Sequence, residues 1–347
     1  MSEYSVTALT PLDPSGQARL HAFLALNGIR RDDNLDYTCV LTDADGQWIA
    51  TGSCYLNTLR CIAIGQAYQG EGLLRRIVSH LLAVQAARGN THVFLYTKPD
   101  AAPRFADLGF FEVARVLDAV VFMENRRRGF KDFLEELKTH RRPGSAAAVV
   151  INANPFTLGH LCLVETTAAA CDTLHLFVVS EDASLVPYPV RWRLVRDGVS
   201  HLGNVLCHAT GPYLISNATF PSYFILDAED VVREHARLDV QVFLAIAGAM
   251  AITRRFVGEE PKSRVTAMYN QVMQDELPRG GVALTVIPRA RHAGEPVSAS
   301  SVRQLLHAGC VEAIRLLVPD STYRFFQSPE AQPVLARIRA AEKVVHD

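Results

Sequence analysis

The stretch that decides the fold is residues 146–160, AAAVVI followed directly by NANPFTLGH. Six small and apolar residues in a row are typical of a strand that is buried on both faces of a sheet. An Asn-Pro pair then indicates a turn, and Thr157, Gly159 and His160 stand where a helix is expected to begin. The stretch therefore predicts a strand, a tight turn and a helix, with polar side chains at the junction.

Downstream of this stretch, apolar runs alternate with amphipathic segments as far as residue 288. Alternation of this kind predicts a parallel sheet with helices on both faces, in which ligands bind at the carboxyl ends of the strands. The predicted strands are 146–151, 174–180, 204–209, 240–246 and 282–288, and the predicted helices are 159–170, 189–200, 222–236 and 263–276.

Upstream, residues 1–124 show shorter predicted strands and one clear helix at 72–88, which is an α+β pattern. Residues 125–145 contain a short amphipathic helix between two basic clusters, and RRPGS ends it. We therefore predict a small α+β domain over 1–124, a linker helix over 125–145 and an α/β domain over 146–347. The predicted strands of the first domain are 37–42, 48–56, 61–65 and 92–97.

Composition excludes several classes of function. The 35 basic and 36 acidic side chains give a net charge of -1, so no basic surface for nucleic acid is indicated. The seven cysteines form no CxxC pair, and the histidines share no metal-ligand spacing, so neither a disulfide framework nor a protein-held metal is expected. The longest apolar run, 240–252, is too short for a bilayer, which needs about 20 residues. We expect a cytoplasmic protein without a membrane partner.

The junction after the first α/β strand is a candidate phosphate site. A helix start offers backbone N–H groups and the positive end of the helix dipole, which suit phosphate oxygens. Gly159 permits a close backbone approach, and His160 on the first turn can donate a hydrogen bond. An ordinary Asn-Pro turn followed by a helix cap, with His160 at the surface, explains the same residues equally well.

A second candidate stretch lies near the other end of the domain, at residues 296–303, PVSASSVR. Ser298 and Ser300 are placed to cap a helix and to bind phosphate oxygens, and Arg303 on its first turn suits bidentate phosphate binding. A simple helix cap is the alternative.

Together the two stretches resemble the two signatures of the nucleotidyltransferase superfamily, (T/H)xGH after the first strand and an ISSxxxR-like motif at the end of the domain. The resemblance implies that Thr157 and His160 contact the α- and β-phosphates of a nucleotide. It also implies that Ser298, Ser300 and Arg303 hold the departing pyrophosphate. Val297 and Ala299 replace the Ile and the middle Ser of the second motif.

Longer segments resemble the citrate lyase ligase family across residues 145–325; they are INANPFTLGH, 174–198, ISNATFPSYF (215–224), ITRRFVGEEP (252–261) and PVSASSVRQLL. The resemblance implies that ATP and acetate form acetyl-adenylate, and that the thiol of the phosphopantetheine-type group on the lyase's acyl carrier protein then takes the acetyl group. It also implies Mg²⁺ as a cofactor. The other residues expected around the nucleotide are Asn152, Asn154, Pro155, Phe156 and Arg289, of which Arg289 is equally well explained as a surface residue.

The N-terminal domain carries a resemblance of its own. YQGEGLLRRIVSHLL (68–82) is similar to the pyrophosphate loop of GNAT acetyltransferases, and Gln69, Gly70 and Gly72 match it. Leu74 departs from the pattern, because a final Gly or Ala usually stands there. The resemblance implies a GNAT-like domain with a loop for CoA or pantetheine. The sequence supports equally a domain that binds such a group and one that no longer binds it.

Three other functions remain open at this stage. An acetate ligase for the carrier protein of a malonate decarboxylase would share this architecture. A dinucleotide-forming adenylyltransferase would use both phosphate motifs without the longer segments. A GNAT acetyltransferase with a nucleotide-sensing C-terminal domain belongs to a different class, and acetyl transfer from acetyl-CoA without ATP would reveal it.

Overall fold

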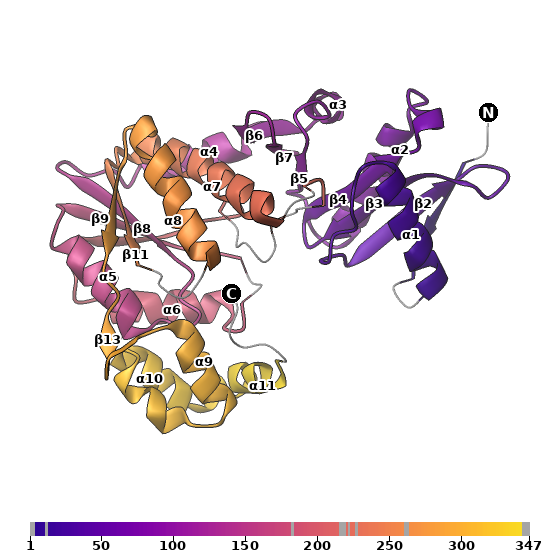
Figure 1. Ribbon diagram of the computed structural model, residues 1–347. Helices are drawn as coiled ribbons and strands as arrows, with labels where there is room; N and C mark the ends of the chain where they lie inside the picture. The colour runs from indigo at the N-terminus through magenta and orange to yellow at the C-terminus, as the bar shows by residue number, and fades with distance from the viewer. Residues whose placement is uncertain are drawn as a thin grey trace. The chain divides into compact units, whose positions relative to one another are not determined.

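The computed structural model describes residues 4–10, 13–181, 184–214, 220, 223–225, 228–259 and 264–341. The chain divides into two compact units, one made of residues 1–132 and 221–241 and the other of residues 133–220 and 242–347 (Figure 1). The division expected from the sequence placed residues 221–241 in the C-terminal domain, whereas here they belong to the first unit. That unit is therefore built from two separate parts of the chain. Of the quoted segment 215–224, only residues 220, 223 and 224 are described, and of segment 252–261 only residues 260 and 261 lie outside the described residues.

The first unit is an α+β structure around a seven-stranded sheet, as predicted. Its strand order is β1-β2-β3-β4-β5-β7-β6, and all neighbours are antiparallel except the central parallel pair β4 and β5. The elements are β1 (Ser5–Ala8), α1 (Pro14–Leu26), β2 (Tyr37–Thr42), β3 (Trp48–Tyr55), β4 (Thr58–Ile64), α2 (Leu73–Ala87), β5 (Phe94–Thr97), α3 (Ala102–Ala106), β6 (Phe111–Val116) and β7 (Val120–Glu124).

Helix α2 connects the two parallel strands and covers the sheet. Its buried residues Leu73, Ile77, Val78 and Leu81 recur at helical spacing, and they join the core of the unit with residues of β3 and β5. Burial of one such aliphatic side chain contributes about 1.5–3 kcal/mol. The helix predicted over 72–88 is confirmed.

The second unit contains a five-stranded parallel sheet of order β10-β9-β8-β11-β12. The first strand, β8, lies in the middle, so the chain first builds one side of the sheet and then the other. Strand order reverses between β8 and β11, and the carboxyl end of β8 is therefore the place where such sheets bind ligands. The predicted parallel sheet is confirmed. The strands are β8 (Ala146–Ile151), β9 (Thr173–Val178), β10 (Val205–Ala209), β11 (Arg254–Gly258) and β12 (Ala283–Ile287), and β13 (Arg291–His292) pairs with β14 (Glu295–Pro296).

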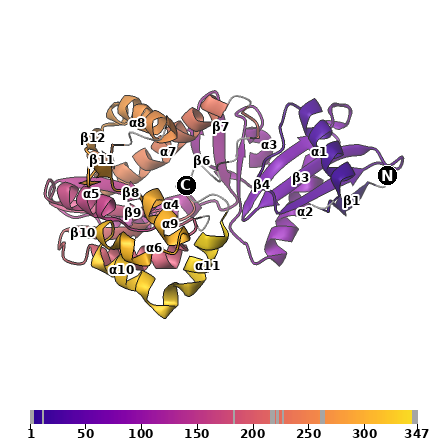
Figure 2. The same cartoon turned by 60° about the horizontal axis from the view of Figure 1, so that its bottom comes forward.

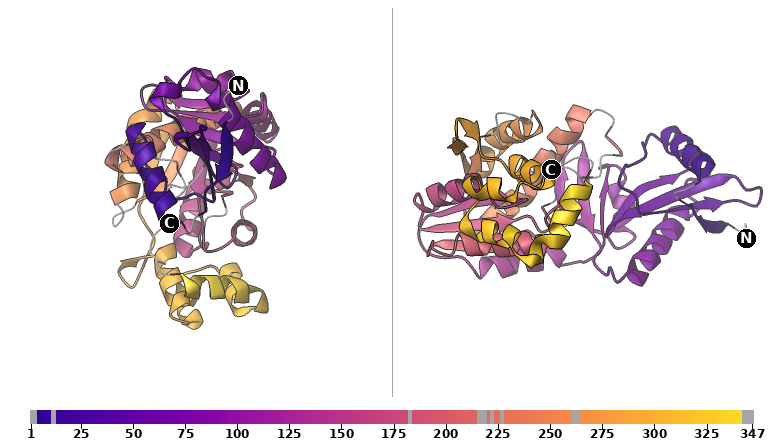
Figure 3. Two further views of the ribbon diagram at one scale, coloured as in Figure 1. Left: turned by 90° about the vertical axis from the view of Figure 1, so that its right-hand side faces the viewer. Right: turned by 90° about the horizontal axis from the view of Figure 1, so that it is seen from below.

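Helices cover both faces of this sheet (Figure 2). One face bears α5 and α6, and the C-terminal helices α9 to α11 continue the same layer, because all five share one hydrophobic core with β8 and β9 (Figure 3). The opposite face bears α8 and the end of α7 (Figure 1). The helices are α4 (Gly129–Lys138), α5 (Leu158–Ala168), α6 (Tyr188–Gly198), α7 (Ala228–Met250), α8 (Arg264–Glu276), α9 (Ala299–His307), α10 (Asp320–Gln327) and α11 (Gln332–Ala340).

The strand predicted over 240–246 is wrong, because these residues lie inside α7. The buried positions Ala236, Val240, Phe243 and Ala247 follow a helical spacing that begins upstream of the apolar run. The fourth strand is instead β11, in a segment whose charged start does not resemble a buried strand. A short apolar run does not by itself distinguish strand from helix. Here the helical spacing already begins among the polar residues before the run, which identifies the run as part of a helix.

Two further expectations concern the whole chain. Within the described residues, no helix combines the length and the apolar character that a membrane crossing requires. All seven cysteines lie in the described segments as free thiols, of which only Cys310 is exposed. Burial raises the pKa of the Cys39 and Cys61 thiols to about 12, so both are unreactive at neutral pH.

Candidate active site

The site begins where β8 ends. Register pairs Ile151 with Val178 and Val178 with Ala209, so β8, β9 and β10 finish level with one another. The chain leaves β8 through Asn152 and Ala153, passes a cis peptide bond between Asn154 and Pro155, and enters α5 at Leu158. The loop expected from the sequence to carry chemistry therefore lies at the switch point of the sheet.

Thr157 and His160 form a reciprocal capping box at the start of α5. The Thr157 hydroxyl accepts a hydrogen bond from the His160 backbone N–H (3.3 Å), and the Thr157 backbone N–H donates to His160 Nδ1 (3.1 Å). Because Nδ1 is the acceptor, the proton of the neutral ring resides on Nε2. The pair thus satisfies two backbone N–H groups at the start of the helix and, among the described residues, leaves Nε2–H of the ring as a free hydrogen-bond donor.

The surroundings of His160 keep its ring neutral. Burial, and then the positive charges of Arg289 and Arg303, lower its pKa to about 4. Phe156 is fully buried and stacks on the imidazole, with 5.9 Å between the ring centroids and 14° between the planes. At neutral pH the group is an oriented hydrogen-bond donor that carries no charge.

The second motif is built in the same way. Ser298 is the N-cap of α9, and its hydroxyl accepts from the backbone N–H of Ser301 at 3.0 Å. The Arg303 guanidinium is fully buried and donates to Ser300 Oγ (3.1 Å) and to the carbonyl oxygen of Asn154 (2.5 Å). The predicted cap is confirmed, and Arg303 links the second motif to the loop of the first.

Gly159 lies where the starts of α5 and α9 approach each other. A Cβ added to Gly159 would lie 2.8 Å from the carbonyl oxygen of Val297 and 3.4 Å from Thr157 Oγ1. The absence of a side chain here therefore lets the starts of α5 and α9 lie against each other. The structure brings together all five motif residues expected from the sequence, which are Thr157, His160, Ser298, Ser300 and Arg303.

The remaining expected residues build the loop. Asn154 is buried and its Oδ1 accepts from the Val186 N–H at 3.0 Å, and Asn152 Nδ2 donates to Ser184 Oγ at 3.0 Å. Pro155 is buried as well. Arg289 follows β12, is half-buried, and lies close enough to His160 to affect its pKa. Nucleotide contacts by these residues stay predictions.

Sequence reasoning missed Arg191, a residue of α6 that organises the same loop. Its guanidinium is fully buried and donates to the carbonyl oxygens of Asn152 (2.8 Å), Val179 (2.7 Å) and Val186 (3.0 Å). A signal was present, because Arg191 shares the apolar face of α6 with Leu194. An arginine at such a position is rarely buried without a specific set of acceptors.

The second unit is a Rossmann-like α/β structure, and both sequence motifs meet at the switch point of its sheet. A model of the citrate lyase ligase C-terminal domain matches residues 146–326. A citrate (pro-3S)-lyase ligase of Klebsiella pneumoniae is 40% identical over 82% of this chain and 85% of that protein, and one of Escherichia coli strain K12 is 38% identical over 90% of each. The chain belongs to the citrate lyase ligase family.

Solved structures match the N-terminal third of the chain. An acyl-CoA N-acyltransferase from Pseudomonas aeruginosa is 18% identical, covers 36% of this chain and 100% of its own, and has a TM-score of 0.30. Escherichia coli ElaA is 14% identical over 36% of this chain and 100% of its own, with a TM-score of 0.31.

Proposed function

We propose that this protein activates acetate with ATP and transfers the acetyl group to the prosthetic-group thiol of the acyl carrier subunit of citrate lyase. The relatives are ligases of that lyase, which supports the lyase as the acceptor. The seven free thiols suit a reducing compartment, so the proposal places the protein in the cytoplasm. One observation supports this chemistry: the starts of α5 and α9 meet at the switch point of the sheet. Gly159 permits their close approach, and Arg303 donates a hydrogen bond to the carbonyl oxygen of Asn154.

In the first step a carboxylate oxygen of acetate attacks the α-phosphorus of ATP, and the bond to the bridging oxygen of pyrophosphate breaks. The neutral ring of His160 donates from Nε2 to a phosphate oxygen as negative charge develops there, and Thr157 holds the ring in place. The start of α9, with Ser298 and Ser300, receives the leaving pyrophosphate. Arg303 and Arg289 add positive charge near both groups. Catalysis is by positioning and charge stabilisation, so the protein needs no nucleophile.

Mg²⁺ would enter with the nucleotide. The site offers hydroxyls, an imidazole N–H and guanidinium groups, which suit phosphate oxygens and not a metal ion. Across the described residues, no group of three or more His, Cys, Asp or Glu is arranged to hold a metal. The phosphate oxygens themselves are therefore the expected ligands, and the ion neutralises part of their charge.

In the second step the carrier thiolate attacks the carbonyl carbon of acetyl-adenylate. A thioester forms, and the carbon–oxygen bond to the phosphate of AMP breaks. Acetate, ATP and a carrier thiol thus give AMP, pyrophosphate and the acetylated carrier, with no net oxidation or reduction.

The test is ATP–pyrophosphate exchange with the purified protein and Mg²⁺, with and without acetate. Exchange that depends on acetate and needs no carrier is the expected result. If a folded, ATP-binding protein shows no exchange even with the carrier present, acetate activation is contradicted. Exchange driven by phosphopantetheine in place of acetate would instead identify a dinucleotide-forming adenylyltransferase.

A further inference from the structure

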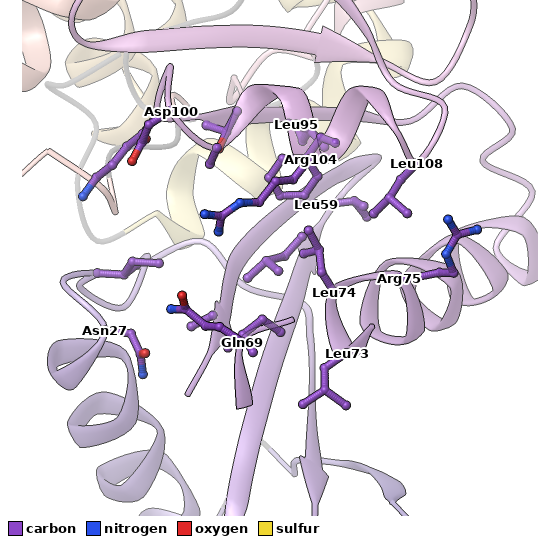
Figure 4. A pocket seen from close by; sticks show the side chains of 18 of the residues that line it. Asn27, Leu59, Gln69, Leu73, Leu74, Arg75, Leu95, Asp100, Arg104 and Leu108 are labelled. Atoms are coloured by element: carbon purple, nitrogen blue, oxygen red, sulfur yellow. The ribbon is translucent and has the colours of Figure 1, made fainter. Parts of the chain in front are cut away.

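The first unit contains a cavity of about 650 Å³ beside the turn before α2 (Figure 4). Gln69, Gly70 and Gly72 line it, and so does Leu74, the residue that departs from the GNAT pattern. Gly70 and Gly72 have φ values of 93° and 74°, a conformation that favours glycine. The cavity thus lies where the resemblance places a CoA or pantetheine group, and binding there stays a prediction. The packing around His160 in the second unit is a separate feature, which the resemblance does not explain.

Phe156 packs against His160 from the core of the second unit. Its side chain is fully buried and belongs to the same core as Leu194 and Val195 of α6. Its ring stacks on the imidazole with 5.9 Å between the centroids, and the two planes are 14° from parallel. A fully buried ring has no exposed surface for a nucleotide, so an effect of Phe156 on the reaction has to pass through His160.

Gly198, the last residue of α6, makes room for this ring. A Cβ added to Gly198 would lie 2.6 Å from Cε1 and 3.0 Å from Cδ1 of Phe156. Carbon atoms in ordinary contact are about 3.5–4.0 Å apart, so the ring would have to move. The φ of Gly198 lies outside the left-handed region, and a glycine weakens a helix relative to alanine. Room for the Phe156 ring therefore explains the glycine at this position, whereas the helix does not.

Two contacts hold the His160 ring in different ways. At Nδ1 the ring accepts from the backbone N–H of Thr157 (3.1 Å), and Thr157 Oγ1 lies 2.9 Å from the same nitrogen. Contacts at one atom fix that atom and leave the ring able to tilt about it. The stack on Phe156 opposes the tilt, because a close-packed aromatic ring yields little. Together the two contacts determine the direction in which Nε2–H points.

We propose that Phe156, with Gly198 packed against its edge, is a positioning residue that fixes the plane of the His160 ring and so directs Nε2–H at a phosphate oxygen of the reacting nucleotide. The inference rests on the proposed function for the identity of that acceptor, while the ring geometry does not depend on it. A donor displaced by about 1 Å costs up to about 10²-fold in rate. The end of α6 therefore belongs to the site, although no reacting group is assigned to it.

Two substitutions disturb the ring plane, and a third is the matched control. Phe156→Leu removes the flat face and keeps an apolar side chain, and Gly198→Ala pushes the Phe156 ring from its place. Gly280→Ala creates a similar clash elsewhere in the second unit, because its Cβ would lie 2.4 Å from Leu244 Cδ2. Gly280 precedes β12, so it lies at the amino end of the strands, opposite to the motifs.

Acetate-dependent ATP–pyrophosphate exchange, measured below the unfolding temperature of each variant, gives the effect on the reaction. We expect Phe156→Leu and Gly198→Ala each to lower the maximal rate about 10–100-fold, with the KM for ATP changed less than about threefold. Gly280→Ala should change the rate less than about twofold, because its clash affects stability and not the site. A comparable loss of rate in Gly280→Ala would overturn the inference, since crowding of the core would then be sufficient.

A double-variant cycle tests whether Gly198 acts through Phe156. In the Phe156→Leu background, the flexible leucine can turn away from a Cβ at position 198. Adding Gly198→Ala to Phe156→Leu should therefore lower the rate less than about twofold further. Two losses that multiply in the double variant would show that Gly198 acts by another route, and would overturn its role.

NMR spectroscopy reads the geometry of the His160 ring directly. Its imidazole signals are assigned in protein with ¹⁵N-labelled histidine by their loss in His160→Asn. The ring current of Phe156 acts on the nearby imidazole protons, so Phe156→Leu and Gly198→Ala should shift these signals and Gly280→Ala should not. The proton should stay on Nε2 in all three variants, because Thr157 still donates to Nδ1. Unshifted His160 signals in both Phe156→Leu and Gly198→Ala would overturn the inference.

The NMR experiment needs neither ATP nor acetate, so it separates this inference from the proposed function. Shifted His160 signals in the variants of a protein whose native form shows no exchange would contradict the proposed function and support the ring geometry. Normal exchange in Gly198→Ala with shifted His160 signals would overturn this inference and leave the proposed function intact.

Discussion

At the scale of single residues, the proposed chemistry depends on which nitrogen of His160 carries its proton. The backbone N–H of Thr157 occupies Nδ1, so the requirement to cap α5 also decides that Nε2 is the donor. The helix cap and the proposed catalytic role therefore share one imidazole, and substitutions that preserve only one of its nitrogens can separate the two roles.

His160→Ala is expected to lower acetate-dependent exchange by about 10²–10³-fold and also to destabilise the helix start. His160→Asn places an oxygen near the position of Nδ1 and should recover the cap, while exchange stays as low as in the Ala variant. Exchange assays and thermal unfolding of both variants check this. An Asn variant that is as active as the native protein would contradict the role of Nε2–H.

Gly159 makes a second prediction at this scale. Gly159→Ala should cost about 1–3 kcal/mol of stability, because its Cβ would approach the Val297 carbonyl oxygen to 2.8 Å and force the motifs apart. The control is Gly248→Ala in α7, where a Cβ meets no atom within 4 Å and a small gain is expected. Urea unfolding of both variants compares them. Similar stabilities of the two variants would mean that the backbone around Gly159 and Val297 shifts to accommodate the added Cβ at no cost in stability.

At the scale of elements, α6 positions the loop after β8 through Arg191. Its buried guanidinium satisfies carbonyl oxygens of Asn152, Val179 and Val186, all at the edge of the sheet where ligands are expected. Helix α6 thus holds the shape of the loop that leads into the first motif.

Arg191→Met should therefore be destabilising by about 3 kcal/mol or more, since several buried carbonyl oxygens lose their donor. Exchange should fall as well, because the loop is no longer held. Arg193→Met on the same helix is the control, as its exposed pair with Glu330 is worth at most about 1 kcal/mol. Urea unfolding and the exchange assay measure both. Equal losses of stability and of exchange activity in the two variants would mean that the Arg191 hydrogen bonds do not stabilise the loop.

The elements also show which features of the fold and the site can be predicted from the sequence. The run 146–151, the polar junction after it and Ser298 before α9 follow local rules, so the sequence predicts β8, α5 and the cap at Ser298. The sequence wrongly predicts a strand over 240–246, because local hydrophobicity does not distinguish a buried strand from the buried part of α7. The partners of Gly159, Arg191 and Arg303 are set by tertiary packing, which local pattern does not contain.

At the scale of the whole molecule, we expect two buried histidines to make stability sensitive to acid. His175 and His208 lie on neighbouring strands with 3.0 Å between Nδ1 and Nε2, and burial, with their own charges and those of His140 and Arg142 nearby, lowers their pKa values to about 4 and 3. Both pKa values are lower in the folded state. The stabilisation is therefore complete above pH 6.5, the ordinary value, and is lost as the pH falls from there towards 4.

We expect the free energy of unfolding to fall by up to about 1.4 kcal/mol per pH unit for each such histidine in that window. His208→Gln keeps an amide near Nε2 and should flatten the fall, while His307→Gln, at an exposed position, should not. Urea unfolding between pH 7.5 and 4.5 provides the comparison. An unchanged slope in His208→Gln would contradict this account.

The division into units gives a last prediction. A polypeptide of residues 133–347 would contain Tyr223 and Phe224, which are buried in the first unit, without most of that unit. We expect it to self-associate and to bind a hydrophobic dye, and coexpression with residues 1–132 should reduce both effects. Size-exclusion chromatography and dye fluorescence measure them. A monomer that binds no dye would mean that residues 221–241 fold without the first unit.

The two-part composition of the first unit also determines when it can form during synthesis. A ribosome that has completed residue 132 must still add roughly a hundred residues before 221–241 emerge, which takes about 5–20 s at typical elongation rates. Throughout that interval the nascent sheet lacks Tyr223, whose hydroxyl donates to the carbonyl oxygen of Tyr96 at 2.9 Å in the folded unit. The N-terminal unit, although it is translated first, is therefore completed only after the first three parallel strands of its neighbour have left the ribosome.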